Sequence, residues 1–148
     1  MRVRVYASAL LLAWSGAMIG AQDQKVTTPE QLDKVMKQVQ PAMQAMQKAF
    51  KSQAYADVRK NLLTAKDAVF LSQSFWVEHK KDDAVKLNKD VLAKMEALEK
   101  IVATDTVDVP AAEAALKEVG AACRACHQQY RATDADNNFI LKPGSIGG

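Results

Sequence analysis

Two cysteines and a histidine lie together near the end of the chain, in the stretch CRACHQQYR at residues 123–131. Cys123 and Cys126 are the only cysteines of the chain, and His127 is one of its two histidines. On an α-helix, residues at i, i+3 and i+4 project from one face, so these three side chains are predicted to point the same way. Two thiols beside an imidazole can bind a metal, exchange a disulfide or anchor a cofactor.

The spacing C-x-x-C-H is the pattern by which haem is attached covalently in c-type haem proteins. The two thiols add to the two vinyl groups on one edge of the porphyrin, and the adjacent imidazole reaches the iron as its proximal ligand. We therefore predict one covalently attached haem c, with Cys123 and Cys126 as its anchors and His127 as an iron ligand.

Two other interpretations of the motif stay open. A thiol–disulfide site has the same C-x-x-C spacing, but it normally lies at the N-terminal end of a helix in an α/β fold. A zinc site would need a fourth ligand besides Cys123, Cys126 and His127, and only His79 or a carboxylate could supply it. His79 lies among charged residues in EHKKDD and is expected to face solvent.

The N-terminus predicts a secretory signal peptide at residues 1–21. Arg2 and Arg4 precede an apolar run from Val5 to Ile19, and small residues follow this run. Cleavage is expected after Ala21, with a cut after Ala17 or a retained membrane anchor as the alternatives. Loss of residues 1–21 removes two arginines and no acid, so the formal net charge falls from +3 to +1. A charge near zero argues against nucleic-acid binding through a general basic surface.

Four segments with apolar residues at helical spacing follow, at about 28–50, 54–76, 84–102 and 108–130. Thr28 and Asp108 are candidate N-caps, and each is followed within two residues by a proline. The stripe of the first segment comprises Leu32, Met36, Val39, Met43, Met46 and Phe50, and Pro41 interrupts it. The sequence predicts an all-α fold, an antiparallel four-helix bundle over residues 22–131, with an irregular tail at 132–148.

Two stretches carry a family resemblance, VGAACRACHQQYR at 119–131 and TPEQLDKVMKQVQPAM at 28–43. In these the chain resembles cytochrome c-prime and its low-spin relatives, the class II c-type cytochromes. Low-spin members of that class supply a methionine to the iron from a stretch like LMK early in the first helix. The resemblance places Met36, in the stretch VMK, at that position, with Met43 as the alternative. A methionine on an apolar stripe is more often a packing residue, and that interpretation of Met36 also stays open.

The resemblance implies an exported, periplasmic cytochrome that carries single electrons between redox partner proteins and is not an enzyme. It also implies that Arg131 pairs with a haem propionate and that Tyr130 lies against the ring, although an ordinary surface arginine and a core tyrosine are the alternatives. A homodimer is an expectation from the resemblance alone, and no nucleic acid or membrane partner is expected after signal removal. The alternative within the haem class is a five-coordinate protein that binds small gases such as NO or CO.

Overall fold

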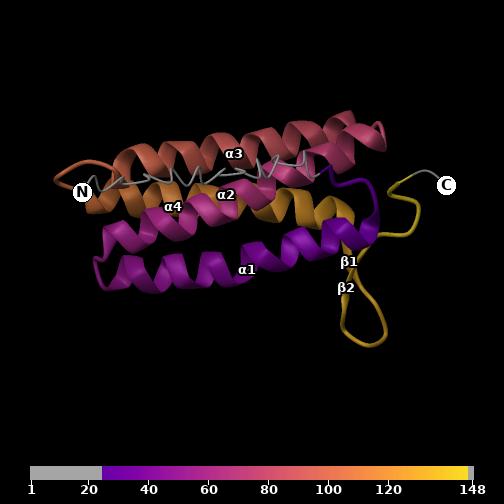
Figure 1. Cartoon of the computed structure of the whole chain (residues 1–148), viewed down its shortest axis with the longest axis horizontal. Helices are drawn as coiled ribbons and strands as arrows, with labels where there is room; N and C mark the ends of the chain where they lie inside the picture. Colours follow the sequence, from indigo (N-terminus) through magenta and orange to yellow (C-terminus); the bar gives the residue numbers. More distant parts are fainter. Residues whose placement is uncertain (1–24, 147–148) are drawn as a thin grey trace, which may run out of the picture.

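Residues 25–146 are described by a computed structural model, and the predicted signal peptide at 1–21 lies outside this range. Four α-helices make up most of the described chain, and together they confirm the predicted antiparallel four-helix bundle (Figure 1). Their bounds are α1 Pro29–Lys51, α2 Tyr55–Glu78, α3 Asp82–Val102 and α4 Val109–Tyr130. None of the helices described is long and apolar enough to cross a membrane.

The predicted helix starts of α1 and α4 are confirmed by their caps. The Thr28 side chain accepts a hydrogen bond from Gln31 N, and Gln31 Oε1 accepts one from Thr28 N, which together form a capping box. Asp108 Oδ1 accepts from Ala111 N at 3.0 Å in front of α4. The helix α1 runs unbroken through Pro41, whose side chain is exposed.

Consecutive helices lie side by side, because only short turns connect them. Close backbone contact runs from α1 to α2, from α2 to α3 and from α3 to α4. In contrast, α1 and α4 have almost no close backbone approach, although they would be neighbours in a closed bundle. The bundle is therefore least tightly closed along the seam between its first and last helices.

Two groups of buried residues form the core. The central cluster joins all four helices and contains the fully buried Met46, Leu62, Met95, Leu98 and Val119. The end cluster lies where α1 begins and α4 ends, and its buried members are Val26, Leu32, Val35, Ala68, Phe75, Trp76, Ala84 and Tyr130. The predicted stripe of α1 contributes to both clusters.

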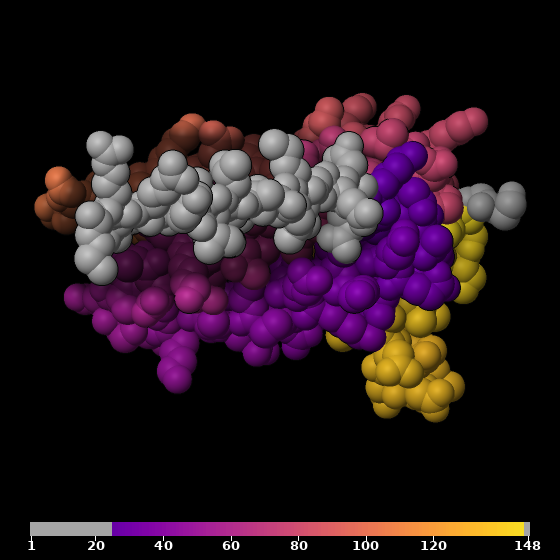
Figure 2. Space-filling view, viewed as in Figure 1, coloured from indigo at the N-terminus to yellow at the C-terminus, as the bar shows by residue number. Residues whose placement is uncertain are grey.

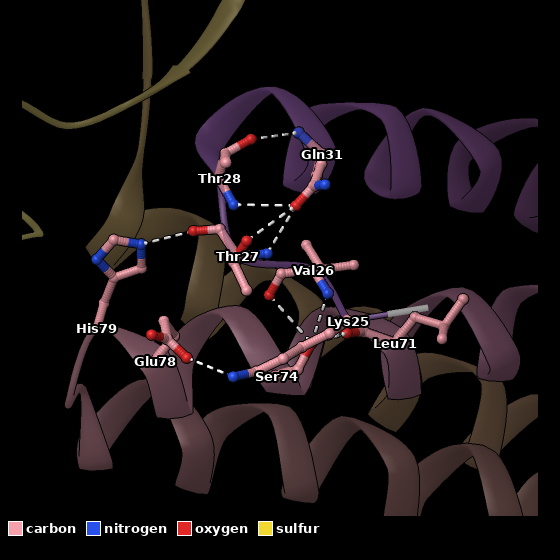
Figure 3. A network of polar contacts seen from close by, with 9 residues as sticks. All are labelled: Lys25, Val26, Thr27, Thr28, Gln31, Leu71, Ser74, Glu78 and His79. Atoms are coloured by element: carbon pink, nitrogen blue, oxygen red, sulfur yellow. Dashed lines mark hydrogen bonds and ion pairs between the residues drawn. The ribbon is translucent and has the colours of Figure 1, made fainter. Parts of the chain in front are cut away.

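The segment before α1 is fastened to the end of α2 (Figure 3). Val26 is 2% exposed, and its backbone N donates to Ser74 Oγ at 2.9 Å. One step further along, His79 Nε2 lies 3.1 Å from Thr27 O, and the His79 ring packs 4.4 Å from the Phe75 ring. The prediction that His79 faces solvent is wrong, because the folded N-terminal segment covers one side of its ring.

The tail that was predicted to be irregular contains a β-hairpin. Its strands are β1 Arg131–Thr133 and β2 Phe139–Leu141, paired antiparallel with Ala132 opposite Ile140. Asp134 Oδ1 closes the turn by accepting from Asp136 N and Asn138 N, and Asn137 takes a left-handed φ of 63°. Strands of three residues are too short to show an alternating pattern, so only the turn-forming residues mark the hairpin in the sequence.

We expect Ser74→Ala to lower the free energy of unfolding by about 1–2 kcal/mol, because Val26 N would be left buried without its acceptor. Urea unfolding of the haem-loaded protein measures the change. Thr64→Ala is the matched control, since Thr64 is exposed and its hydroxyl bonds only within α2. The control should not destabilise the protein, because alanine has the higher helix propensity. An equal loss in both variants would contradict the fastening role of Ser74.

Candidate haem site

The motif residues Cys123, Cys126 and His127 occupy the last two turns of α4. All three are half-buried, and neither cysteine forms a disulfide. The helix is continuous through the motif, so the i, i+3, i+4 spacing places the three side chains on one face as predicted. The sequence favours helix here because alanines surround the motif and neither glycine nor proline follows Gly120 before the helix ends.

Partial burial sets the protonation of the three groups. Burial raises the pKa of the Cys123 thiol, and burial together with the neighbouring Cys123 and Asp83 raises the pKa of Cys126 to about 11. Burial, and secondarily the Arg131 guanidinium, lowers the pKa of His127. At neutral pH the chain therefore presents two protonated thiols and a neutral imidazole. The neutral form of histidine binds iron, because one ring nitrogen has a free lone pair.

The motif lies at the junction of the two core clusters. Cys123 packs against the central cluster and Cys126 against the end cluster. On α1, Met43 borders the central cluster, Met36 borders the end cluster and Val39 borders both. The structure thus places Met36 beside the cluster that Cys126 also borders.

Half-buried residues lie along both helices of the open seam. On α1 these are Met36, Val39 and Met43, whereas their neighbours Val35, Ala42 and Met46 are buried. On α4 they are Gly120, Cys123, Cys126 and His127. We call these seven residues the seam. A flat apolar cofactor needs apolar groups on both of its faces. Half-buried apolar residues on two helices without close backbone contact meet this need.

Tyr130 ends the core stripe of α4. It is 5% exposed, its ring centroid lies 4.7 Å from that of Trp76, and its hydroxyl donates to Asp83 Oδ2 at 2.5 Å. Burial and this bond raise the pKa of Tyr130, and the same bond lowers the pKa of Asp83. The structure therefore shows Tyr130 as a core residue, and its contact with haem stays a prediction.

Arg131 follows Tyr130 at the start of the hairpin. Its guanidinium carbon lies 4.0 Å above the centre of the Phe139 ring, a cation–π contact, and the residue is exposed. The pairing of Arg131 with a haem propionate also stays a prediction. Sequence reasoning missed the Phe139 partner because the hairpin that supplies it was not foreseen.

Two polar features of the bundle were not found from the sequence. Asp83, at the start of α3, joins Tyr130 and Gln129 at the end of α4. Asn88 is 5% exposed inside the bundle and donates to Val69 O and Ser72 Oγ, while its Oδ1 is buried without a partner in the described chain. An acidic first turn and a mid-helix asparagine are common on surfaces, so neither position stood out in the sequence.

The donor set fits haem c better than the other two interpretations. Within residues 25–146, no group of three or more histidine, cysteine or acidic side chains converges as a metal site would require. The cysteines lie near the C-terminal end of α4, where the helix dipole does not lower a thiol pKa as it does at the N-terminal end of a helix. Covalent haem attachment uses two thiols that form no disulfide, a neutral imidazole and an apolar surface, and the seam offers all three.

These observations define an all-α bundle of the kind that carries a c-type haem in its last helix. The chain belongs to the Cytochrome C' family, whose model matches residues 16–131. Membership in this family implies a covalently bound haem c, and family members are typically periplasmic. No curated protein and no solved structure matches the chain.

We expect Tyr130→Phe to destabilise the protein in a pH-dependent way. The Tyr130 hydroxyl is the main cause of the lowered pKa of Asp83, so folding favours the ionised carboxylate. This contribution is complete above the ordinary aspartate pKa of about 4 and is lost as pH falls through the lowered native value. The stability deficit of the variant should therefore be present at pH 7 and shrink towards pH 3.

Urea unfolding midpoints of wild type and variant at the two pH values test this prediction. Tyr55→Phe is the matched control, because Tyr55 is half-buried on α2 and packs edge-on against Phe50. Its deficit should not change with pH. A Tyr130→Phe deficit of the same size at both pH values would show that the Asp83 bond is not its cause.

Proposed function

We propose that the protein is an exported monohaem cytochrome that carries single electrons, with His127 and Met36 as the axial ligands of its iron. The observation that carries the proposal is the seam. Met36 on α1 and Cys126 on α4 border the same apolar cluster from two helices that do not approach each other closely. This shared cluster supports Met36 as the residue that supplies the second ligand.

Four residues of the seam have distinct roles in this proposal. Cys123 and Cys126 would hold the haem to α4 through thioethers, and the neutral His127 imidazole would bind the iron from the same helix. The Met36 thioether would be the second iron ligand, supplied by α1. Leu32, Val35 and the aromatic residues of the end cluster keep water away from that side. A haem with histidine and methionine ligands has a raised potential and exchanges electrons without substrate chemistry.

Met36 is favoured over Met43 by its position along α1. The helix rises about 1.5 Å per residue, so Met43 lies about 10 Å further from the end where α4 carries His127. Met43 borders the central cluster, whereas Met36 borders the end cluster together with Cys126. The resemblance of VMK to the ligand stretch of low-spin members points to the same residue.

The proposed partners are redox proteins of the periplasm. The Cytochrome C' family suggests a haem protein that is not an enzyme, so we propose a carrier of electrons. A mature net charge of +1 offers no general basic surface for nucleic acid. Pairing of two copies into a homodimer remains part of the proposal through the family resemblance alone.

The five-coordinate alternative assigns Met36 a different task. There the thioether would only pack beside the iron, as its apolar neighbours Leu32 and Val35 do, and small gases would bind at the open face. Met36 is half-buried, which suits either task. The two functions therefore differ in whether the sulfur of Met36 is bonded to iron.

We expect Met36→Ala to convert a low-spin iron to a high-spin iron that binds CO rapidly, because the distal ligand would be lost. Visible spectra of the oxidised and reduced protein, before and after CO, measure the change. Met43→Ala is the matched control, since it removes an equally half-buried methionine from the same helix stripe. The control should keep the low-spin spectrum and the thioether-to-iron charge-transfer band.

Three results would each redirect the assignment. A low-spin spectrum in Met36→Ala and its loss in Met43→Ala would identify Met43 as the ligand. A wild-type protein that is already high-spin and binds CO would support the five-coordinate function. Complete extraction of the pigment by acid acetone, or absence of haem after export in a host with the maturation machinery, would return the cysteines to zinc or thiol chemistry.

A further inference from the structure

The two halves of the proposed iron site lie on two different helices. His127 is on α4 and Met36 is on α1, and the backbones of these two helices have almost no close approach. The distance between the two ligands therefore depends on whatever else joins the helices. Side chains of the two core clusters join them in part. The hairpin adds a second connection, because β1 continues directly from α4 and β2 lies close to α1.

The hairpin and the turn after it lie beyond the part of the chain that the family explains. The family match ends at Arg131, the residue at which β1 begins. Figure 1 shows the hairpin at the end of the bundle where α1 begins and α4 ends, and in Figure 2 it forms a lobe beside the first residues of α1. The segment is thus an addition at the end of the bundle that carries the motif.

Lys142 fastens this segment to the last turn of α4. The final carbonyl groups of a helix have no partners within the helix. Lys142 donates hydrogen bonds to two of these carbonyls. Its Nζ donates to Gln128 O at 2.6 Å, and its backbone N donates to Tyr130 O at 2.8 Å. Gln128 directly follows His127, and a positive charge is favourable at this end of a helix.

Leu141 and Ile146 fasten the same segment to the core. Both pack against the end cluster, which Met36 and Cys126 also border. Between them, Pro143 and Gly144 form a turn closed by Ser145 N donating to Lys142 O at 3.0 Å, and Gly144 takes a φ of 74°. Glycine adopts that conformation without strain, so the turn directs Ile146 back to the bundle.

We propose that residues 131–146 are a latch that holds the His127 turn of α4 against α1 and thereby keeps the iron closed to outside ligands. Leu141 and Lys142 are its positioning residues: they act on the iron through the spacing of the two helices. The latch deepens the proposed function and rests on it, because it explains how a protein with an open seam holds Met36 in place.

The test compares the double variant L141A/K142M with wild type in the full-length, haem-loaded protein. Lys142→Met keeps the length of the side chain but removes the bond to Gln128 O, and Leu141→Ala removes the contact with the end cluster. The matched control is I140A/K117M, which changes an exposed residue of the same strand and an exposed lysine of α4. Lys142→Arg, which keeps a cationic donor, serves as the conservative variant.

Two quantities are measured, CO association with the reduced protein and amide hydrogen exchange in the last turn of α4 and the first two turns of α1. We expect L141A/K142M to bind CO about tenfold faster and to lose about tenfold in exchange protection at both helix ends, the size expected for a lost charged hydrogen bond. The control and Lys142→Arg should stay within about twofold of wild type in both quantities.

The outcomes separate the latch from the proposed function. Slow CO binding in wild type and in L141A/K142M alike would overturn the latch and leave the electron-carrier proposal standing. Fast CO binding by wild type would overturn the six-coordinate iron, and amide hydrogen exchange would then test the latch alone. Unchanged amide protection in L141A/K142M would overturn the latch, and loss of protection at both helix ends would uphold it.

Discussion

The pitch of the α-helix is the constraint on which the site depends. Cys123, Cys126 and His127 share a face only while α4 stays helical through its last two turns, so every contact that holds those turns also holds the site. Packing of Tyr130 against Trp76, its bond to Asp83 and the Lys142 contacts with Gln128 and Tyr130 all act there. Helix ends ordinarily fray because their carbonyls lack partners, and here three separate elements supply contacts that oppose fraying.

A second constraint comes from what the site must enclose. Three of the four sides of the bundle are closed by close backbone contact, and the fourth, between α1 and α4, is not. The seam residues on those two helices are only half-buried, while the central cluster behind them is fully buried at Met46, Leu62 and Val119. The core is thus dense enough to keep the helices rigid, and the apolar surface left at the seam is available to a cofactor. A rigid surround suits a centre whose geometry changes little on electron exchange.

Patterns local in sequence predicted most of the fold and the attachment motif. The apolar stripes, the caps at Thr28 and Asp108 and the C-x-x-C-H spacing each depend on residues within one helix, so the sequence shows them directly. His79 and the hairpin were mispredicted because tertiary contacts decide them: the segment at Thr27 covers His79, and the short β2 strand is held against α1. The Asp83–Tyr130 bond joins residues 47 apart, and no local pattern marks such a pair.

The two proposed iron ligands differ in the same way: one depends on contacts within a helix and the other on tertiary contacts. In the proposed site, attachment and the proximal ligand come from five consecutive residues of one helix, so they do not depend on the positions of the other helices. The proposed distal ligand comes from a different helix, and a tenfold change in its occupancy needs only about 1.4 kcal/mol. That amount is within the range of one charged hydrogen bond. In this proposal, the contacts that space α1 from α4 set whether the bundle carries electrons or opens to gases, and the motif itself does not distinguish the two functions.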